Sequence, residues 1–249
     1  MDLSHIRGIV FDKDGTLFGF NATWTVWAKT FLTDLAKGDL QIATDLGQAI
    51  GYDFEAEAFL PTSVAIAGTP EDIADALLPH VPDRSKKDLI WVMNVAASEA
   101  PQAEVTPLAA FLSKLRDRGL MLGVATNDAE MPARAHLRSA NIEGQFAFIA
   151  GSDSGFGGKP SAGQLQAFCQ KVGLTPDEIL MVGDSSHDIA AGRALGCLTC
   201  GVLTGLAARK DLEQIADFVL PDISHLLVAF DAGIDVDQWI HSLLTEDCA

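Results

Sequence analysis

The stretch IRGIVFDKDGTLF, residues 6–18, runs from an apolar segment directly into three charged residues. Residues 9–11 (Ile-Val-Phe) have the character of a buried strand, and Asp12, Lys13 and Asp14 follow at its end. A buried carboxylate without a partner is costly, and two carboxylates this close together repel each other. The arrangement therefore indicates that the two carboxylates have a chemical function at the end of the strand.

The composition restricts the classes of partner. The chain has 249 residues, of which 48% are apolar, which is enough for one large domain or for a domain with an insert. It carries 34 acidic and 17 basic side chains, a formal charge of −17. This charge argues against nucleic acid and against anionic membrane surfaces as partners. An anionic substrate needs a local source of positive charge, such as a bound cation or a lysine.

The cysteines and the N-terminus indicate a soluble cytoplasmic protein. The opening residues MDLSHIRGIVF have neither the basic start nor the apolar stretch of a signal peptide, and no window approaches the roughly 20 apolar residues of a membrane span. Of the four cysteines, Cys197 and Cys200 have CxxC spacing. They lie in an apolar, strand-like run with no second cysteine pair, so we interpret them as buried thiols.

Apolar runs alternate with helix-like segments through the second half of the chain. The predicted strands are residues 6–11, 120–127, 146–153, 178–185, 197–203 and 217–220. Strands separated by helices of ten or more residues predict a parallel sheet with right-handed crossovers. Their continuous rather than alternating hydrophobicity fits strands that are buried on both faces. The predicted fold class is therefore α/β.

The segment between the first two predicted strands has a different character. Helical stretches dominate it, with helix-start signals such as TPE at residues 69–71, and no apolar run there is as long as those of the sheet. We therefore predict an all-helical insert at residues 20–102, within a core domain made of residues 1–19 and 103–249. The last segment, residues 235–249, is predicted to form a terminal helix.

Polar side chains follow several of the predicted strands. In open α/β sheets, ligands bind beyond the carboxyl ends of the strands. The candidate site residues at these ends are Asp12, Asp14, Thr126, Asn127, Lys159, Asp184 and Asp188. A carboxylate can attack phosphorus, clustered oxygen ligands suit Mg²⁺, and a lysine with a hydroxyl can hold phosphoryl oxygens. The pattern indicates phosphoryl transfer.

Four segments resemble, in order, the four motifs of the haloacid dehalogenase superfamily. They are DKDGTL at 12–17, ATN at 125–127, GGKP at 157–160 and GDSSHD at 183–188. The chain is most similar to the phosphoglycolate-phosphatase-like branch, and the resemblance covers residues 1–19 and 103–230. It implies a Rossmann-like, doubly wound parallel sheet with a helical cap domain of the C1 type between the first and second motifs.

The resemblance also implies a role for each candidate residue. It makes Asp12 the nucleophile and a magnesium ligand, and Asp14 the general acid and base, with its backbone carbonyl on the metal. Lys13 departs from the apolar residue that is common between these two aspartates. The remaining implied roles are phosphate binding at Thr126, Asn127 and Lys159, and metal binding at Asp184. Asp188 is implied either to bind the metal or to support the residues that do.

These features predict a Mg²⁺-dependent phosphatase that hydrolyses a small soluble phosphomonoester through an aspartyl-phosphate. The resemblance makes 2-phosphoglycolate a candidate substrate, beside sugar phosphates and nucleoside monophosphates. Two alternatives stay open, a phosphomutase of the β-phosphoglucomutase type, which uses the same residues, and a non-catalytic phosphate-binding protein. The sequence leaves the oligomeric state open.

Side chains of the insert are candidates for recognising the rest of the substrate. Phe18 and Phe20 follow the first motif and are candidates for the rim of the site. Trp24 and Trp27 are three residues apart on one predicted helical face, where core packing is the first expectation. The candidate anion-binding side chains are Lys29, Lys37, Arg84, Lys86 and Lys87.

Overall fold

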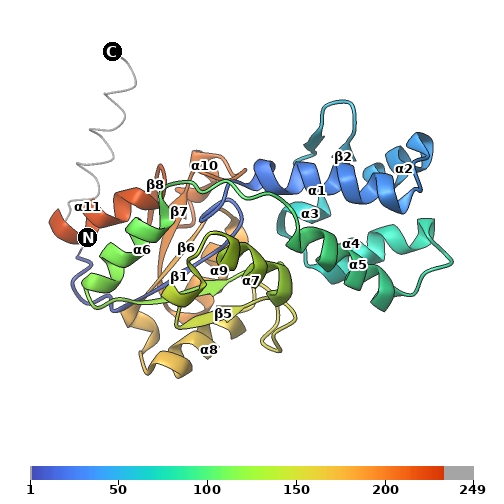
Figure 1. The fold of residues 1–249 in the computed structure, drawn as a ribbon. Coiled ribbons are helices and arrows are strands. Elements are labelled where there is room, and N and C mark those ends of the chain that lie inside the picture. The colour runs from blue at the N-terminus through green and yellow to red at the C-terminus, as the bar shows by residue number, and fades with distance from the viewer. Residues whose placement is uncertain (1, 233–249) are drawn as a thin grey trace, which may run out of the picture.

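The structure is a computed structural model that describes residues 2–232. The terminal helix predicted at residues 235–249 lies outside the described residues. Figure 1 shows a central sheet with helices on both of its faces and a second, helical body to one side of it. Among the described residues, no helix has the length and apolar character needed to cross a membrane.

The sheet has six strands, all parallel, and confirms the predicted α/β class. From edge to edge the strand order is β5-β4-β1-β6-β7-β8. The strands are β1 (Gly8–Phe11), β4 (Met121–Ala125), β5 (Phe148–Ala150), β6 (Ile179–Gly183), β7 (Leu198–Val202) and β8 (Phe218–Leu220). Each lies within a segment predicted from its apolar run. Because β1 lies between β4 and β6, the ends of three motif-bearing strands are neighbours.

Helices cover both faces of the sheet, which explains the unbroken hydrophobicity of β1. The helices of this body are α6 (Leu108–Asp117), α7 (Glu130–Ser139), α8 (Gly163–Val172), α9 (Ser186–Leu195), α10 (Arg209–Leu212) and α11 (Leu226–Ala232). Three short 3₁₀ helices join them, η2 (Glu143–Gln145), η3 (Pro176–Glu178) and η4 (Ile223–His225). Ile9 and Phe11 belong to a cluster with residues of α6, α7 and α11, whereas Val10, on the opposite face, packs with residues of α8 and α9.

The insert has a hydrophobic cluster of its own. Its buried members all lie between Phe20 and Ala97, and they include Trp24 and Trp27 of α1. The helices are α1 (Phe20–Leu35), α2 (Leu40–Ile50), α3 (Val64–Ala67), α4 (Pro70–Leu77), the 3₁₀ helix η1 (Leu78–His80) and α5 (Lys86–Ser98). Thr69 caps α4 through a reciprocal pair of hydrogen bonds with Asp72, as the start signal at residues 69–71 predicted.

The prediction that the insert is entirely helical is wrong. Two antiparallel strands, β2 (Tyr52–Asp53) and β3 (Ala58–Phe59), form a short hairpin. The carboxylate of Asp53 accepts hydrogen bonds from the backbone N–H groups of Glu55 and Ala56, which closes the turn. Strands of two residues are too short to show an alternating pattern, so the sequence carried no strand signal here.

Candidate active site

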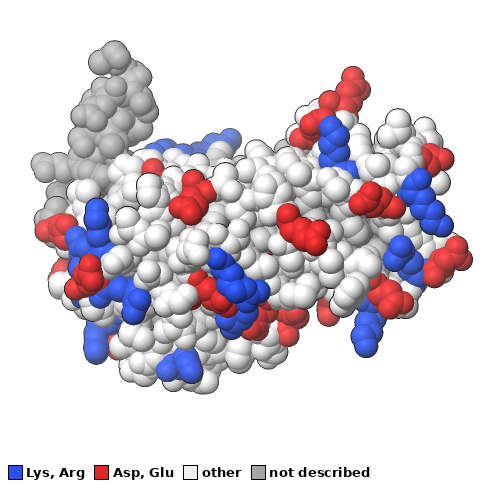
Figure 2. Space-filling view, in the orientation of Figure 1, with Lys and Arg blue, Asp and Glu red and all other residues white. Residues whose placement is uncertain are grey.

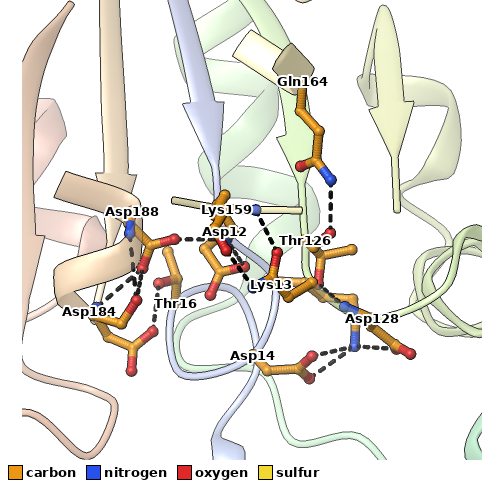
Figure 3. Close-up of polar contacts among 12 residues, drawn as sticks. Asp12, Lys13, Asp14, Thr16, Thr126, Asp128, Lys159, Gln164, Asp184 and Asp188 are labelled. Atoms are coloured by element: carbon orange, nitrogen blue, oxygen red, sulfur yellow. Dashed lines mark hydrogen bonds and ion pairs between the residues drawn. The ribbon is translucent and has the colours of Figure 1, made fainter. Parts of the chain in front are cut away.

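The carboxyl ends of β1, β4 and β6 open into one cavity between the sheet and the insert. Six of the seven predicted site residues line it, and Asp188 lies behind them. The six are Asp12, Asp14, Thr126, Asn127, Lys159 and Asp184. Figure 3 shows five of them, Asp12, Asp14, Thr126, Lys159 and Asp184, gathered at the strand ends. Lys159 belongs to the loop between β5 and α8. The structure therefore assembles the residues that the sequence placed at the strand ends.

Lys159 joins two of the buried carboxylates. Its Nζ lies 2.6 Å from Oδ1 of Asp12 and 2.6 Å from Oδ1 of Asp188, and the lysine side chain is 3% exposed. Burial raises the pKa of Asp12 to about 7, because it favours the neutral acid more strongly than the attraction of Lys159 favours the carboxylate. The repulsion from Asp188 and Asp14 adds to this increase. At neutral pH the nucleophile candidate is therefore only partly ionised, and further positive charge nearby would favour its carboxylate form.

The carboxylates have the geometry of a site for a hard cation. Asp12, Asp184 and Asp188 are buried and each offers an oxygen within 4.8 Å of the others. Burial, followed by repulsion from Asp12 and Asp188, raises the pKa of Asp184 well above its ordinary value. Three buried oxygen donors with a net negative charge are the set that Mg²⁺ or Ca²⁺ binds, so the residues present fit a divalent cation.

Two glycines leave room for the Asp184 carboxylate. Gly15 has φ = +80°, and a Cβ atom there would lie 2.5 Å from the Asp184 carboxylate. A Cβ atom on Gly205 would lie 1.7 Å from the same group, so neither glycine tolerates a side chain. Thr16 adds a hydrogen bond from Oγ1 to Oδ1 of Asp184, at 3.4 Å. The loops after β1 and β7 thus enclose the carboxylate that follows β6.

Asp188 uses both of its carboxylate oxygens within the protein. Oδ1 pairs with Lys159, and Oδ2 accepts hydrogen bonds from the backbone N–H and the hydroxyl of Ser185 at the start of α9. Asp188 thereby both caps the helix and anchors the lysine. A role in supporting Lys159 is consistent with all of these contacts.

Asp14 forms an ion pair with the adjacent Lys13, whose side chain has no exposed surface. Lys13 Nζ lies 2.7 Å from Asp14 and 3.3 Å from Oδ2 of Asp128, the latter an ion pair without hydrogen-bond geometry. Burial alone lowers the pKa of Lys13, but Asp14 and Asp128 outweigh it and raise the pKa overall. Burial raises the pKa of Asp128 to about 6 despite Lys13. Figure 3 shows Lys13 between the two carboxylates.

His136 of α7 connects this ion-pair cluster to the insert. Its Nδ1 lies 3.1 Å from Lys13 Nζ, and its Nε2 lies 2.7 Å from the carbonyl oxygen of Ala97 in α5. An ammonium can only donate and a carbonyl can only accept, so the ring is neutral with its proton on Nε2. Burial and Lys13 lower the pKa of His136 to about 4, which agrees with this assignment.

Thr126 and Asn127 differ in how far their side chains are already engaged. The Thr126 hydroxyl accepts a hydrogen bond from the Asp128 backbone at 3.1 Å and keeps its own hydrogen for another acceptor. The Asn127 amide donates to the carbonyl oxygens of Ala67 and Lys159, and its oxygen accepts from the Lys159 backbone N–H. Asn127 thus ties the α3–α4 segment of the insert to the loop that carries Lys159.

The insert faces the cavity with apolar side chains. We call this surface the apolar wall, and it consists of Phe20, Trp24, Ala65, Ile66, Pro70 and Ile73. Phe20 lines the cavity, whereas Phe18, the other rim candidate, is buried in the core cluster and does not line it. Trp24 takes part both in the packing of the insert and in the wall.

None of the five basic side chains that the sequence suggested as anion binders lines the cavity. Lys29 pairs with Glu57, and Lys86 lies 2.8 Å from Asp75. Lys37, Arg84 and Lys87 are exposed. On the face drawn in Figure 2, basic side chains lie among acidic ones and form no continuous basic patch.

The sequence reasoning missed the partners of Lys13. A lysine directly after a buried strand needs buried counter-charges, and Asp128 follows the second motif at the end of the neighbouring strand. That neighbourhood could have suggested the Lys13–Asp128 pair. His136 carried no such signal, because its contact with Lys13 depends on how α7 packs.

Comparisons with known proteins agree with this arrangement. The family model of the haloacid dehalogenase-like hydrolases matches residues 6–196. The phosphoglycolate phosphatase of Chromobacterium violaceum is 31% identical over 230 residues, which cover 91% of this chain and 97% of that protein. The pyrophosphatase PpaX of Bacillus pumilus is 28% identical over 93% of this chain and 100% of its own length.

A solved structure supports the fold independently. The crystal structure of a predicted phosphoglycolate phosphatase from Haemophilus somnus superposes with a TM-score of 0.65 at 20% sequence identity. The match covers 90% of this chain and 98% of that one. The likeness therefore extends over both the sheet and the insert.

Proposed function

The chain belongs to the haloacid dehalogenase-like hydrolases and is a phosphoric monoester hydrolase, and on that premise we propose how it works. The substrate is a small soluble phosphomonoester, the reaction passes through an aspartyl-phosphate on Asp12, and Mg²⁺ is the cofactor. One observation carries this proposal. The buried Asp12 at the end of the central strand is paired with Lys159, and Asp14 lines the same cavity two residues later.

In the first half-reaction, a carboxylate oxygen of Asp12 forms a bond to phosphorus as the bond from phosphorus to the substrate oxygen breaks. Asp14 donates its proton to the departing oxygen, so an alcohol leaves. In the second half-reaction, Asp14 takes a proton from water, whose oxygen attacks phosphorus. Phosphate leaves, the Asp12 carboxylate is restored, and Asp14 is protonated again.

The other residues bind the phosphoryl group and the cation. Lys159 and the hydroxyl of Thr126 would contact phosphoryl oxygens. Asp188 would keep Lys159 at the nucleophile, and the ion pairs of the lysine with Asp12 and Asp188 support this role. Asp12 and Asp184, with Asp188 beside them, are the buried oxygen donors that would hold Mg²⁺. The family resemblance adds the backbone carbonyl of Asp14 to this set. When bound, the cation offsets the repulsion between Asp12 and the phosphate and stabilises charge on the phosphoryl oxygens.

We propose further that residues 20–102 act as a cap domain over a core of residues 1–19 and 103–249. The separate hydrophobic cluster of the insert supports this division. Its position above the site would exclude water during the first half-reaction. We place the enzyme in the cytoplasm, where the free thiols of Cys169, Cys197 and Cys200 stay reduced. The names of relatives make 2-phosphoglycolate and pyrophosphate the first substrates to test.

The test is phosphate release from a panel of metabolite phosphates with Mg²⁺ and with EDTA, for the wild type and for Asp12→Asn. We expect Mg²⁺-dependent release by the wild type and at least a thousandfold loss in the variant, because an amide is no nucleophile toward phosphorus. Circular dichroism checks that the variant is folded. Substantial turnover by folded Asp12→Asn contradicts the mechanism. Transfer of phosphate between two positions of a sugar, without release, identifies a phosphomutase.

A further inference from the structure

We propose that the leaving group of this enzyme is an uncharged, predominantly apolar alcohol, selected by the apolar wall. The inference rests on the proposed function, because it concerns the part of the substrate that lies beyond the phosphoryl group. It separates this chain from enzymes whose leaving group carries a carboxylate or a phosphate.

The position of the leaving group follows from the direction of attack. In phosphoryl transfer, the attacking and leaving oxygens lie roughly in line on opposite sides of phosphorus. Asp12 attacks from the end of β1, on the sheet side of the cavity, so the leaving oxygen points toward the insert. There the apolar wall forms the surface of the cavity. The substrate group attached to the leaving oxygen therefore contacts the wall.

The insert offers no cation to an anionic leaving group. Among the described residues, no lysine or arginine of the insert lines the cavity. Lys159 is already held by Asp12 and Asp188, and Lys13 is enclosed with its own two carboxylates. His187 also lines the cavity, but it belongs to α9 of the core and not to the insert. A second negative charge on the substrate would therefore lie unpaired against apolar side chains, close to several carboxylates.

The wall also has few partners for hydroxyl groups. Of its six side chains, only Trp24 carries a polar hydrogen, on the indole nitrogen. A sugar would lose hydrogen bonds to water there without replacing them. The rings of Phe20 and Trp24, with centroids 6.5 Å apart, instead present apolar surface that favours a branched alkyl or aromatic group.

The first experiment compares kcat/KM of the Mg²⁺-loaded wild type for 2-phosphoglycolate, pyrophosphate and isobutyl phosphate. Isobutyl phosphate has the shape of phosphoglycolate, with two methyl groups in place of the carboxylate oxygens. We expect kcat/KM for isobutyl phosphate to be at least about tenfold higher than for 2-phosphoglycolate or pyrophosphate, whose leaving groups are anionic. Phenyl phosphate, with an aromatic leaving group, is expected to be at least as good as isobutyl phosphate.

The second experiment places a cation in the wall. Ile66 is half-buried, so Ile66→Lys can be accommodated, and Ile66→Met is a control of similar length without charge. We expect Ile66→Lys to raise the ratio of kcat/KM for 2-phosphoglycolate over isobutyl phosphate by about tenfold or more, and Ile66→Met to leave this ratio within about twofold of the wild type. Thermal unfolding confirms that both variants are folded.

The outcomes separate the two proposals. Equal or higher kcat/KM for 2-phosphoglycolate or pyrophosphate overturns the assignment of the leaving group and leaves the phosphatase mechanism standing. An unchanged ratio in folded Ile66→Lys overturns the role of the wall. If the enzyme hydrolyses none of these compounds and none of the wider panel, the proposed function is overturned and the inference with it.

Discussion

Lys13 Nζ lies 2.7 Å from both carboxylate oxygens of the adjacent residue, Asp14, although the Lys13 side chain has no exposed surface. The same nitrogen lies 3.1 Å from His136 Nδ1 and 5.6 Å from the centre of the Trp24 ring. One buried charge thus contacts the general acid candidate, α7 of the core and α1 of the insert. The position of Asp14 is therefore coupled to the contact between core and insert.

Replacing Lys13 with methionine should destabilise the protein severely. Lys13→Met keeps much of the side-chain volume but leaves the buried Asp128 and the partly buried Asp14 without their cation. Breaking a buried ion pair from one side costs about 3–5 kcal/mol, so we expect a loss of this order in the free energy of unfolding, measured with urea at pH 7.5. Adding Asp128→Asn should restore part of the loss. Wild-type stability of Lys13→Met would show that the charge is not needed for packing.

His136 should make the protein sensitive to mild acid. Its pKa is lowered to about 4 in the folded protein, against about 6.5 in the unfolded chain. Between these values the unfolded state binds more protons, so this contribution to stability is complete above pH 6.5 and is lost as the pH falls toward 4. His136→Gln keeps an acceptor for Lys13 and a donor for Ala97 but does not titrate.

The measurement is the difference in unfolding free energy between wild type and His136→Gln at pH 7.5 and at pH 4.5. The comparison cancels the contributions of other groups, including the carboxylates whose raised pKa values act in the opposite direction. We expect the wild type to lose about 2 to 3 kcal/mol relative to the variant at the lower pH. A difference that does not change with pH would mean that the ring is protonated in the folded state.

Asp184→Asn should stabilise the metal-free protein while removing its response to metal. The variant removes the buried charge of Asp184 and its repulsion from Asp12 and Asp188, the two effects that, in this order, raise the pKa of this carboxyl group. In EDTA we expect a higher Tm than that of the wild type, by a few degrees (about 2–4 °C per kcal/mol). Mg²⁺ should raise the Tm of the wild type and not that of the variant. Asp177→Asn, at an exposed acid, controls for general loss of charge. A lower Tm for Asp184→Asn in EDTA would contradict the inference that repulsion among these carboxylates destabilises the metal-free protein.

Asn127→Ala tests whether this side chain binds phosphate or ties the insert to the core. Its amide is already bonded to Ala67 and to both backbone groups of Lys159. We therefore expect kcat/KM to fall by about tenfold or more, as the loss of such a bond network costs more than 1.4 kcal/mol. The constant for competitive inhibition by inorganic phosphate should change by less than about threefold. If the affinity for phosphate falls by the same factor as kcat/KM, Asn127 binds phosphate directly, as the sequence suggested.

Much of the sheet could be predicted because each strand is buried on both faces. Such strands need unbroken apolar runs, and the alternation of these runs with helical segments defines a parallel sheet. The hairpin at Tyr52–Asp53 and Ala58–Phe59 could not be predicted, because it depends on the turn at Asp53 and on packing against α1 and α2 rather than on a pattern of its own.

The site was predictable for a topological reason. Parallel strands present their carboxyl ends at one edge, so Asp12, Thr126 and Asp184 could be expected to meet before any coordinates were known. The central place of β1 in the sheet then decides that Asp12 lies between the other two.

The sequence by itself thus determined the fold class and which polar residues gather at the carboxyl edge of the sheet, since both follow from patterns within short segments. Only the tertiary structure decided the contact of Lys13 with His136 and the character of the wall opposite Asp12. Both depend on contacts between segments far apart in the chain, such as Lys13 with His136 and the α3–α4 segment with Asn127. Such contacts are set by how the insert packs on the core, and local sequence does not encode that packing.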